Sequence, residues 1–428
     1  MQKVALVLHM PHDPRARLCA LVVPAFRIHA VDTKKLQFAA IDLGRQHSDH
    51  AAVLIVEKPA HRSREDKERH SGVTKQEHFD FAPQFPAVRL QVFAVHAAGI
   101  LLHAVCFTSD CAEWTEYFMR TLSEDDVKAS IDPKRIIAAV EEAFRDRYPT
   151  TLIPVRMQMD LADGVFLVMP CYDRAGRALG MKLAMVSQHA SDANEKVHAT
   201  YLLLDIKSGA PSLVISARYL TEIRTAATSA VVTKILARQD VLVLGVFGTG
   251  RQARAHLRVL PLIRRFERFL VSGSDSGRSR EFAEEMAREL SAPVEAVCSK
   301  ICAAESDVLC TCTTSRTPLF DGNLLRPGTH LNLVGAFQPH TREVDDVTVR
   351  RSRIVVDTYE GALAEAGDLL IPLSQGLITR NHILSDLHEL VSGKKNVRGS
   401  ARDISLFKSV GCALEDLVTA ELLAGEPA

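Results

Sequence analysis

The chain has 428 residues, of which 47 % are hydrophobic and 24 % charged, and its 52 basic residues balance its 52 acidic ones. Such a length accommodates two domains with sizeable cores, and the composition is that of an ordinary globular protein. The balanced charge does not indicate a nucleic acid or an anionic membrane as partner, and no apolar run reaches the roughly 20 residues of a membrane span. The nine cysteines follow no disulfide or zinc-binding spacing, so we interpret Cys298, Cys302, Cys310 and Cys312 as small buried side chains and expect no metal site and a reducing, cytoplasmic location.

Residues 1–118 differ in character from the rest of the chain. They contain ten of the seventeen histidines and include a solvated-looking charged run. Short apolar pieces at 51–56 and 90–95 could be strands, but no repeating pattern joins them. The segment lacks the apolar core and cleavage pattern of a signal peptide. We predict a poorly structured extension or a mispredicted start, with the protein proper beginning at Met119.

Residues 119–238 predict two helices, a mainly antiparallel sheet and a third helix. The helix expected over 132–144 carries Ile136, Val140 and Phe144 on one face. The long helix expected over 217–236 contains a run of small residues that permits close packing. Four strand-like pieces punctuated by proline and glycine lie between these helices: 155–159, 165–169, 179–186 and 200–206.

A glycine-rich stretch over 241–253, Val-Leu-Val-Leu-Gly-Val-Phe-Gly-Thr-Gly-Arg-Gln-Ala, has the order of a Rossmann unit: strand, glycine turn, helix start. Gly248 permits the tight turn, Gly250 lets the backbone approach a pyrophosphate, and Ala253 is small enough for close helix packing. The pyrophosphate would lie at the N-terminus of a helix expected from about Gln252 to Phe266, where the helix dipole favours negative charge. The alternative is a glycine turn in an α/β domain that binds no nucleotide.

Further strand-like pieces alternate with helical ones after this turn. This alternation indicates an α/β protein with a doubly wound parallel sheet and its ligand at the carboxyl ends of the strands. From about Thr358 we expect helices and turns that could fold back on the first half of the chain. The strands expected after the glycine turn are 269–272, 307–313, 329–335 and 353–357.

Several separated motifs together resemble those of the ornithine cyclodeaminase/mu-crystallin family. The motifs lie at 224–230, 248–253, 334–344, 365–368 and 406–411. The resemblance covers essentially all of residues 119–428 and none of the first 118. It implies a homodimer in which a Rossmann domain (239–357) is inserted into an α+β substrate-binding and dimerisation domain (119–238 with 358–428).

The resemblance also implies a nicotinamide cofactor and a substrate carboxylate held by Arg156, Lys182 and Arg224. A guanidinium binds a carboxylate through two parallel hydrogen bonds and so orients the neighbouring carbon towards the nicotinamide. Lys182 is a second cation or, if desolvated, a catalytic proton donor to the substrate nitrogen. The cofactor contacts implied by the resemblance come from Thr225, Gly248, Gly250, Arg251, Gln252, Ser274, Thr311, Val334 and Ser409.

Two departures from the family pattern bear on the substrate. Phe337 stands where the cyclodeaminases have an aspartate for the second amine of ornithine, and Leu167 stands where a family glutamate occurs. An unpaired ammonium is costly to bury, so we favour reduction of a small, cyclic imino acid such as a pyrroline- or piperideine-2-carboxylate, or the reverse oxidation of an amino acid. The alternatives are ornithine cyclodeaminase with a different carboxylate, and a crystallin-like protein that binds the cofactor without turnover.

The tip of the second Rossmann strand bears on the choice between NAD and NADP. An NAD site usually has an acidic residue there for the ribose hydroxyls. In this chain Gly273 and Ser274 take that position, with Asp275 just past it. Because Ser274 and Arg278 could accommodate a 2′-phosphate, we favour NADP slightly over NAD.

Overall fold

A computed structural model describes six strand segments between residues 3 and 108, and the chain with its side chains over 119–176, 178–187 and 197–425. The chain divides into two compact units, Met1–Tyr117 and Phe118–Ala428. In the first unit the strands form one sheet in the order β2-β1-β3-β6-β5-β4. They are β1 (Lys3–Leu8), β2 (Cys19–Pro24), β3 (His50–Val56), β4 (Gln76–His78), β5 (Leu90–Ala97) and β6 (Ile100–Thr108). The strands expected at 51–56 and 90–95 are thus β3 and β5; the dispensability of this unit stays a prediction.

We expect a chain that starts at Met119 to be soluble and as active as the full chain. The second unit has hydrophobic cores of its own, and its first strand, β7 (Arg120–Leu122), pairs with β13 (Pro211–Ser216) and is left intact by the cut. Solubility, thermal unfolding and activity of the truncated and full chains would be compared side by side. Loss of folding on truncation would show that the first 118 residues are a structural part of the protein.

In the second unit, two capped helices lie between β7 and the other strands of the first sheet. Ser123 and Asp126 form a capping box at the start of α1, and Asp132 caps α2, with Pro133 as its first residue. A π-helical turn at Ala143–Arg147 extends α2. The helices of this half are α1 (Glu124–Ser130), α2 (Pro133–Glu142) and α3 (Ala217–Leu236).

The first sheet has the order β7-β13-β12-β11-β10-β8, with β9 also paired to β10, and only the β7–β13 pair is parallel. The prediction of a mainly antiparallel sheet is therefore confirmed. In the β10–β11 hairpin Met169 lies opposite Lys182, so both side chains point to the same face. The other strands are β8 (Thr151–Leu152), β9 (Met157–Leu161), β10 (Gly164–Asp173), β11 (Ala178–Ser187) and β12 (Val197–Leu204).

Helix α3 spans the predicted residues 217–236 and is buried along most of its length. It packs against α2 and β12 of the first half and against α4 (Arg251–Val259) of the second. The small residues at 226–230 allow this close approach on several sides. A surface helix would show one apolar stripe, whereas α3 lies at the centre of the unit.

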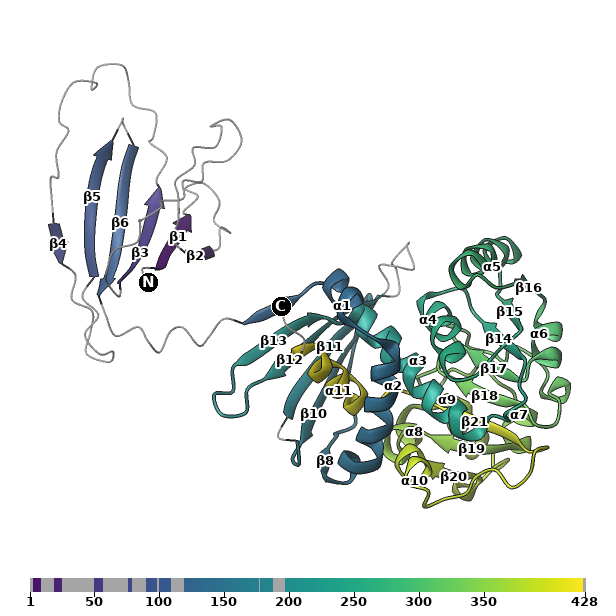
Figure 1. Ribbon diagram of the computed structural model, residues 1–428. Helices are drawn as coiled ribbons and strands as arrows, with labels where there is room; N and C mark the ends of the chain where they lie inside the picture. The colour runs from purple at the N-terminus through teal and green to yellow at the C-terminus, as the bar shows by residue number, and fades with distance from the viewer. Residues whose placement is uncertain are drawn as a thin grey trace. The chain divides into compact units, whose positions relative to one another are not determined.

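The second sheet is entirely parallel, in the order β16-β15-β14-β17-β18-β21-β19-β20 (Figure 1). The strand order reverses between β14 and β17, which is the switch point at which doubly wound sheets bind ligands. The α/β Rossmann prediction is confirmed. The strands are β14 (Val243–Phe247), β15 (Arg268–Ser272), β16 (Val294–Ala296), β17 (Val308–Thr311), β18 (His330–Leu333), β19 (Ser352–Val356), β20 (Ile383–Asp386) and β21 (Ile404–Lys408).

Two expectations for this half need correction. Residues beyond Thr358 are not only helices and turns, because β20 and β21 join the parallel sheet. All five residues of β21 are buried between β18 and β19, so its sequence shows no alternation by which a strand could be recognised. Helix α4 ends at Val259 rather than near Phe266, because Pro261 belongs to a following 3-10 turn.

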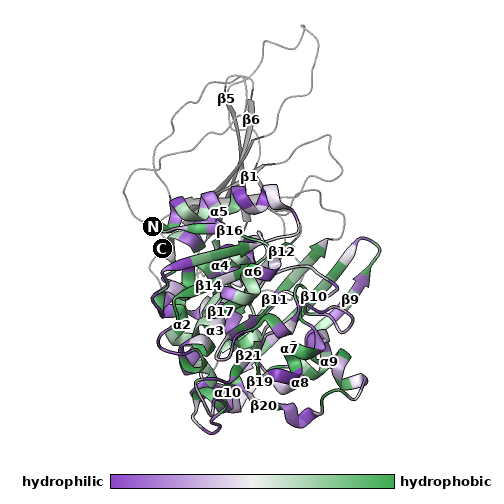
Figure 2. Ribbon diagram, turned by 90° about the vertical axis from the view of Figure 1, so that its right-hand side faces the viewer, coloured by the Kyte–Doolittle hydropathy of each residue, from purple (hydrophilic) through white to green (hydrophobic). Residues whose placement is uncertain are grey.

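Helices cover the parallel sheet, and those at its surface are amphipathic. In Figure 2, α5 alternates between hydrophilic and hydrophobic residues along its length. These helices are α4 (Arg251–Val259), α5 (Ser276–Leu290), α6 (Ser299–Glu305), α7 (Asp346–Arg351), α8 (Tyr359–Glu365), α9 (Gly367–Ser374) and α10 (Leu387–Val391). Short 3-10 turns lie at Tyr148–Thr150, Leu260–Leu262, Gly322–Leu324 and Arg380–His382.

The last helix, α11 (Ala413–Ala424), returns to the first half of the unit. It packs against α2, α3 and strands β10 to β12, and it is drawn in yellow against that sheet in Figure 1. The division of residues 119–428 into two domains stays a prediction. Among the described residues, no helix has the length and apolar character needed to cross a membrane.

Candidate active site

The glycine turn after β14 has the backbone geometry that a dinucleotide requires. Gly248 has a φ of +112°, and a Cβ there would lie 2.6 Å from the Cys312 carbonyl oxygen, so a larger residue would be strained. Gly250 is the N-cap of α4, and a Cβ there would meet no heavy atom within 4 Å. No side chain caps this helix by a hydrogen bond. These features fit the pyrophosphate of a dinucleotide.

Four of the other predicted cofactor residues lie at or just after the carboxyl ends of parallel strands, and a fifth, Thr225, lies on a helix. Thr311 ends β17, Val334 follows β18, and Ser409 follows β21. Ser274 is exposed just after β15. The hydroxyl of Thr225, on α3, donates to the Thr221 carbonyl oxygen at 2.7 Å.

Arg251 and Gln252 open helix α4, and the Arg251 side chain is engaged elsewhere. Its guanidinium donates to Glu222 on α3 and, at 2.7 Å, to Glu124 on α1. These ion pairs join α4 to the first half of the unit. A cofactor contact from the Arg251 side chain would have to compete with both carboxylates.

Sequence reasoning missed Glu343, which ties together the loops after β17 and β18. Its buried carboxylate accepts five hydrogen bonds, from the Thr311 hydroxyl (2.7 Å), the Thr313 N–H (2.8 Å) and hydroxyl (2.7 Å), and the N–H groups of Gly335 (2.8 Å) and Ala336 (3.1 Å). Burial raises the pKa of Glu343, and the neighbouring Asp368 adds to this effect. Glu343 therefore fixes the position of two loops predicted to contact the cofactor.

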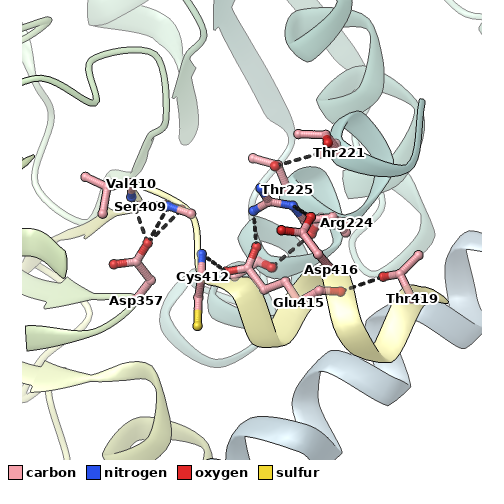
Figure 3. A network of polar contacts seen from close by, with 12 residues as sticks. Thr221, Arg224, Thr225, Asp357, Ser409, Val410, Cys412, Glu415, Asp416 and Thr419 are labelled. Carbon is pink, nitrogen blue, oxygen red and sulfur yellow. Dashed lines mark hydrogen bonds and ion pairs between the residues drawn. The ribbon is translucent and has the colours of Figure 1, made fainter. Parts of the chain in front are cut away.

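Two of the three predicted substrate cations, Lys182 and Arg224, are brought together on buried carboxylates. The Lys182 ammonium lies 2.9 Å from an oxygen of Asp416, and Nε of Arg224 lies 2.9 Å from the same carboxylate. Nη1 of Arg224 donates to Glu415 (Figure 3). Lys182 is 3 % and Arg224 4 % exposed, and both carboxylates are fully buried.

Arg156 lies beside the Val410–Gly411 turn, which follows β21. Its partners differ from those of Lys182 and Arg224. It donates to Glu365 at 2.9 Å and to the carbonyl oxygens of Val410 (3.0 Å) and Phe337 (3.2 Å). A Cβ on the next residue, Gly411, would lie 3.2 Å from both terminal nitrogens of Arg224. Arg156 and Arg224 therefore both border the Val410–Gly411 turn, Lys182 is joined to Arg224 through Asp416, and a cavity lined by Arg156 and Gly411 lies beside the turn.

Asp357, at the end of β19, holds this turn in place. One of its carboxylate oxygens accepts the N–H groups of Val410 and Gly411, both at 2.7 Å, and the Ser409 hydroxyl at 3.2 Å (Figure 3). The turn that borders both arginines is thus fixed by a strand of the parallel sheet. The site is assembled from the two halves of the unit.

Burial changes the acid–base properties of this cluster. It lowers the pKa of Lys182 to about 8, with Arg224 lowering it further against the opposing effect of Asp416. Burial also raises the pKa of Glu415 to about 7, although Arg224 opposes this increase. Both groups can therefore exchange protons near neutral pH.

The carboxylates Glu365, Glu415 and Asp416 were not identified from the sequence. Glu415 and Asp416 lie in α11, a helix of otherwise largely apolar residues. Two adjacent acids in such a run are the one sequence signal that could have identified them, because a buried carboxylate needs a partner.

The two departures from the cyclodeaminase pattern are apolar contacts in the structure. Phe337 lies under the guanidinium of Arg156, 5.2 Å from it to the ring centre. Leu167 is buried in a small cluster with Val165 and Ala184. Neither position offers a carboxylate to a second ammonium.

Comparison with known proteins agrees with this architecture. The sequence profile of the ornithine cyclodeaminase/mu-crystallin family matches residues 116–426. The chain belongs to the ornithine cyclodeaminase/mu-crystallin family. Within this family, Delta(1)-pyrroline-2-carboxylate reductase of Bacillus cereus is 32 % identical over 317 residues, which cover 71 % of this chain and 95 % of the relative. Mouse ketimine reductase mu-crystallin is 35 % identical over 275 residues, covering 63 % and 83 %.

A solved structure is similar to a large part of this chain. Delta(1)-pyrroline-2-carboxylate reductase of Thermococcus litoralis, in complex with NADH and L-proline, superposes with a TM-score of 0.69 and is 38 % identical. The match covers 71 % of this chain and 96 % of the other.

Proposed function

We propose that this protein is an NAD(P)H-dependent reductase of small, cyclic imino acids such as Delta(1)-pyrroline-2-carboxylate. The observation that carries the proposal is the buried Lys182–Arg224 pair beside the Val410–Gly411 turn, in the same unit as an uncapped helix N-terminus suited to a dinucleotide. Relatives whose names are those of pyrroline-2-carboxylate and ketimine reductases support it, as does the NADH and L-proline complex. When bound, the cofactor supplies hydride to the imine carbon.

The residues of the chain bind the substrate and supply protons. Asp416 lies beside Nε of Arg224 and Glu415 accepts from Nη1, so Nη2 and the second hydrogen of Nη1 form the edge that we assign to a substrate carboxylate. An imine carboxylate takes up one proton from solution to form the zwitterionic iminium, and in the site the iminium takes up one hydride and one proton to become a zwitterionic amino acid. Lys182 is the proton donor to the ring nitrogen, because burial has lowered its pKa towards neutrality.

Ornithine cyclisation is the less favoured reaction. Phe337 and Leu167 offer no carboxylate to a second ammonium. The carboxylates close to the cations, Glu365, Glu415 and Asp416, already pair with Arg156, Arg224 and Lys182. A diamino acid would have to break one of these pairs to bind.

For the cofactor we propose a preference for NADP over NAD. The carboxylate of Asp275 caps helix α5 by accepting the Arg278 N–H at 2.9 Å, so it is already used where an NAD site would need it for the ribose. Ser274 and Arg278 are exposed beside it and could contact a 2′-phosphate.

We also place the protein in the reducing cytoplasm, because the six cysteines of the described second unit are free thiols. One of them, Cys298, is exposed rather than buried as expected.

The proposed function is tested by following NADPH and NADH consumption with pyrroline- and piperideine-2-carboxylate, beside L-ornithine with NAD⁺. Reduction of a cyclic imine, faster with NADPH, is the expected result. Conversion of ornithine to proline without reduction of imines would favour the cyclodeaminase. Tight cofactor binding without turnover of any substrate would favour a crystallin-like binding protein.

The pH profile tests Lys182 as the proton donor. Lys182 must be protonated to act, so kcat/KM for reduction should be constant below pH 8 and fall about tenfold per unit above it. The Lys182→Met variant should have a lower kcat and should lack the decline that Lys182 causes. A decline caused by deprotonation of the imine substrate would remain in both the variant and the unaltered protein. An unchanged profile in Lys182→Met would exclude it as the proton donor.

We further propose a homodimer formed through the first sheet. Strand β9 exposes Met157 (57 %), Met159 (44 %) and Leu161 (45 %), an apolar edge that a second subunit could cover. Sedimentation velocity should show a dimer at micromolar concentration, and Met159→Lys should weaken it. A monomer of the unaltered protein under these conditions would contradict the proposal.

A further inference from the structure

The four buried charges that pair around Lys182 and Arg224 balance. Lys182 and Arg224 contribute two positive charges, and Glu415 and Asp416 contribute two negative ones, all with at most 4 % exposure. Charges in such a site must be paired, because an unpaired buried charge is strongly destabilising. An anionic ligand would add an uncompensated negative charge, whereas a zwitterion would add none.

Glu415 is the acid of this cluster whose protonation can offset an added negative charge, and Lys182 supplies the smaller remainder of any proton uptake when it is partly deprotonated. Glu415 faces Arg224 from α3 and is close enough to Lys182 on β11 to act on its pKa, while Asp416 on its own helix and Asp357 after β19 oppose its ionisation. On its own helix the Cys412 N–H is directed at its carboxylate, at 3.3 Å. Burial has already brought its pKa to about 7, and a further carboxylate on Arg224 would raise it more.

We propose that Glu415 makes the substrate site selective for ligands of zero net charge. This inference rests on the proposed function. A zwitterionic iminium acid binds without a change in protonation. An anion of the same shape binds only together with a proton, which Glu415 takes up. Above neutral pH, Glu415 thus discriminates the iminium form of the substrate from 2-oxo and 2-hydroxy acids, which share its carboxylate but lack its positive nitrogen.

Two probes of matched shape test this inference on the full chain saturated with NADPH, or with NADH if that binds more tightly. L-proline is a zwitterion, and tetrahydrofuran-2-carboxylate is its anionic counterpart with oxygen in place of the ring nitrogen. Calorimetry in buffers of different ionisation enthalpy gives the number of protons taken up with each. We expect close to one proton for the anion and none for proline at pH 8, with the anion's affinity falling about tenfold per unit above pH 7.

Glu415→Gln removes the titrating group and is expected to abolish most of the proton uptake and to improve binding of the anion relative to proline at pH 8. Glu421→Gln is the matched control, because Glu421 lies on the same helix but pairs with Arg147. Equal proton numbers for the two probes, or an unchanged uptake in Glu415→Gln, would overturn the inference. If Glu415→Gln does not fold, the comparison of the two probes in the unaltered protein decides alone. Failure of both probes to bind, with no imine reduced, would overturn the proposed function and this inference with it.

Discussion

Gly250→Val is expected to abolish NADPH and NADH binding while leaving the fold intact. A Cβ at Gly250 meets no protein atom within 4 Å, and its backbone is extended, so valine can be accommodated by the protein. The branched side chain then occupies the space in front of α4 where a pyrophosphate must approach the helix N–H groups. Replacing glycine at this N-cap by a β-branched residue costs about 1 kcal/mol, so the melting temperature should fall by only a few degrees.

Fluorescence titration of both cofactors and thermal unfolding check this expectation. Gly399→Val is a suitable control, because a Cβ there meets only Asp403, at an ordinary contact distance of 3.5 Å. Gly248→Ala should behave differently and unfold more readily, because its positive φ and the Cys312 carbonyl oxygen both disfavour a side chain. Unaltered cofactor affinity in Gly250→Val would show that the glycine turn binds no dinucleotide.

Arg224→Lys is expected to lower kcat/KM for an imino acid by about 10²-fold or more, with cofactor affinity nearly unchanged. Lysine retains a positive charge for Glu415 and Asp416 but cannot offer the two parallel donors that orient a carboxylate. Loss of such a charge-assisted pair costs about 3 kcal/mol in transition-state binding. Arg224→Ala should be at least as inactive, but it leaves two buried carboxylates short of a cation and is expected to lose about 3–5 kcal/mol of stability.

Steady-state kinetics together with cofactor titration separate these effects. Arg254→Lys serves as the control, since Arg254 pairs with Glu285 and Glu289 on the surface of α4 and α5. Full activity of Arg224→Lys on every accepted substrate would refute the carboxylate-binding role. The family membership would then speak for the fold and not for the site.

The sequence by itself determined the parts of this protein whose signals are local. The glycine turn at 248–250 needs particular backbone angles. Helix α3, at 217–236, is a long stretch of sequence that no glycine or proline interrupts. The strands of the Rossmann unit alternate with helices. The cations Lys182 and Arg224 were found because motifs around them resemble those of a family. Each of these signals is a continuous stretch of sequence or a series of such stretches.

Only the tertiary structure decided which partners those residues have. Strand β21 is buried on both faces, so it shows no alternation, and its place between β18 and β19 depends on contacts with distant strands. Asp416 lies 234 residues beyond Lys182 in sequence, and the packing of α11 against β11 brings the two charges within 2.9 Å. A buried charge requires a counter-charge, but the sequence does not say which acid supplies it, because that depends on how distant segments pack.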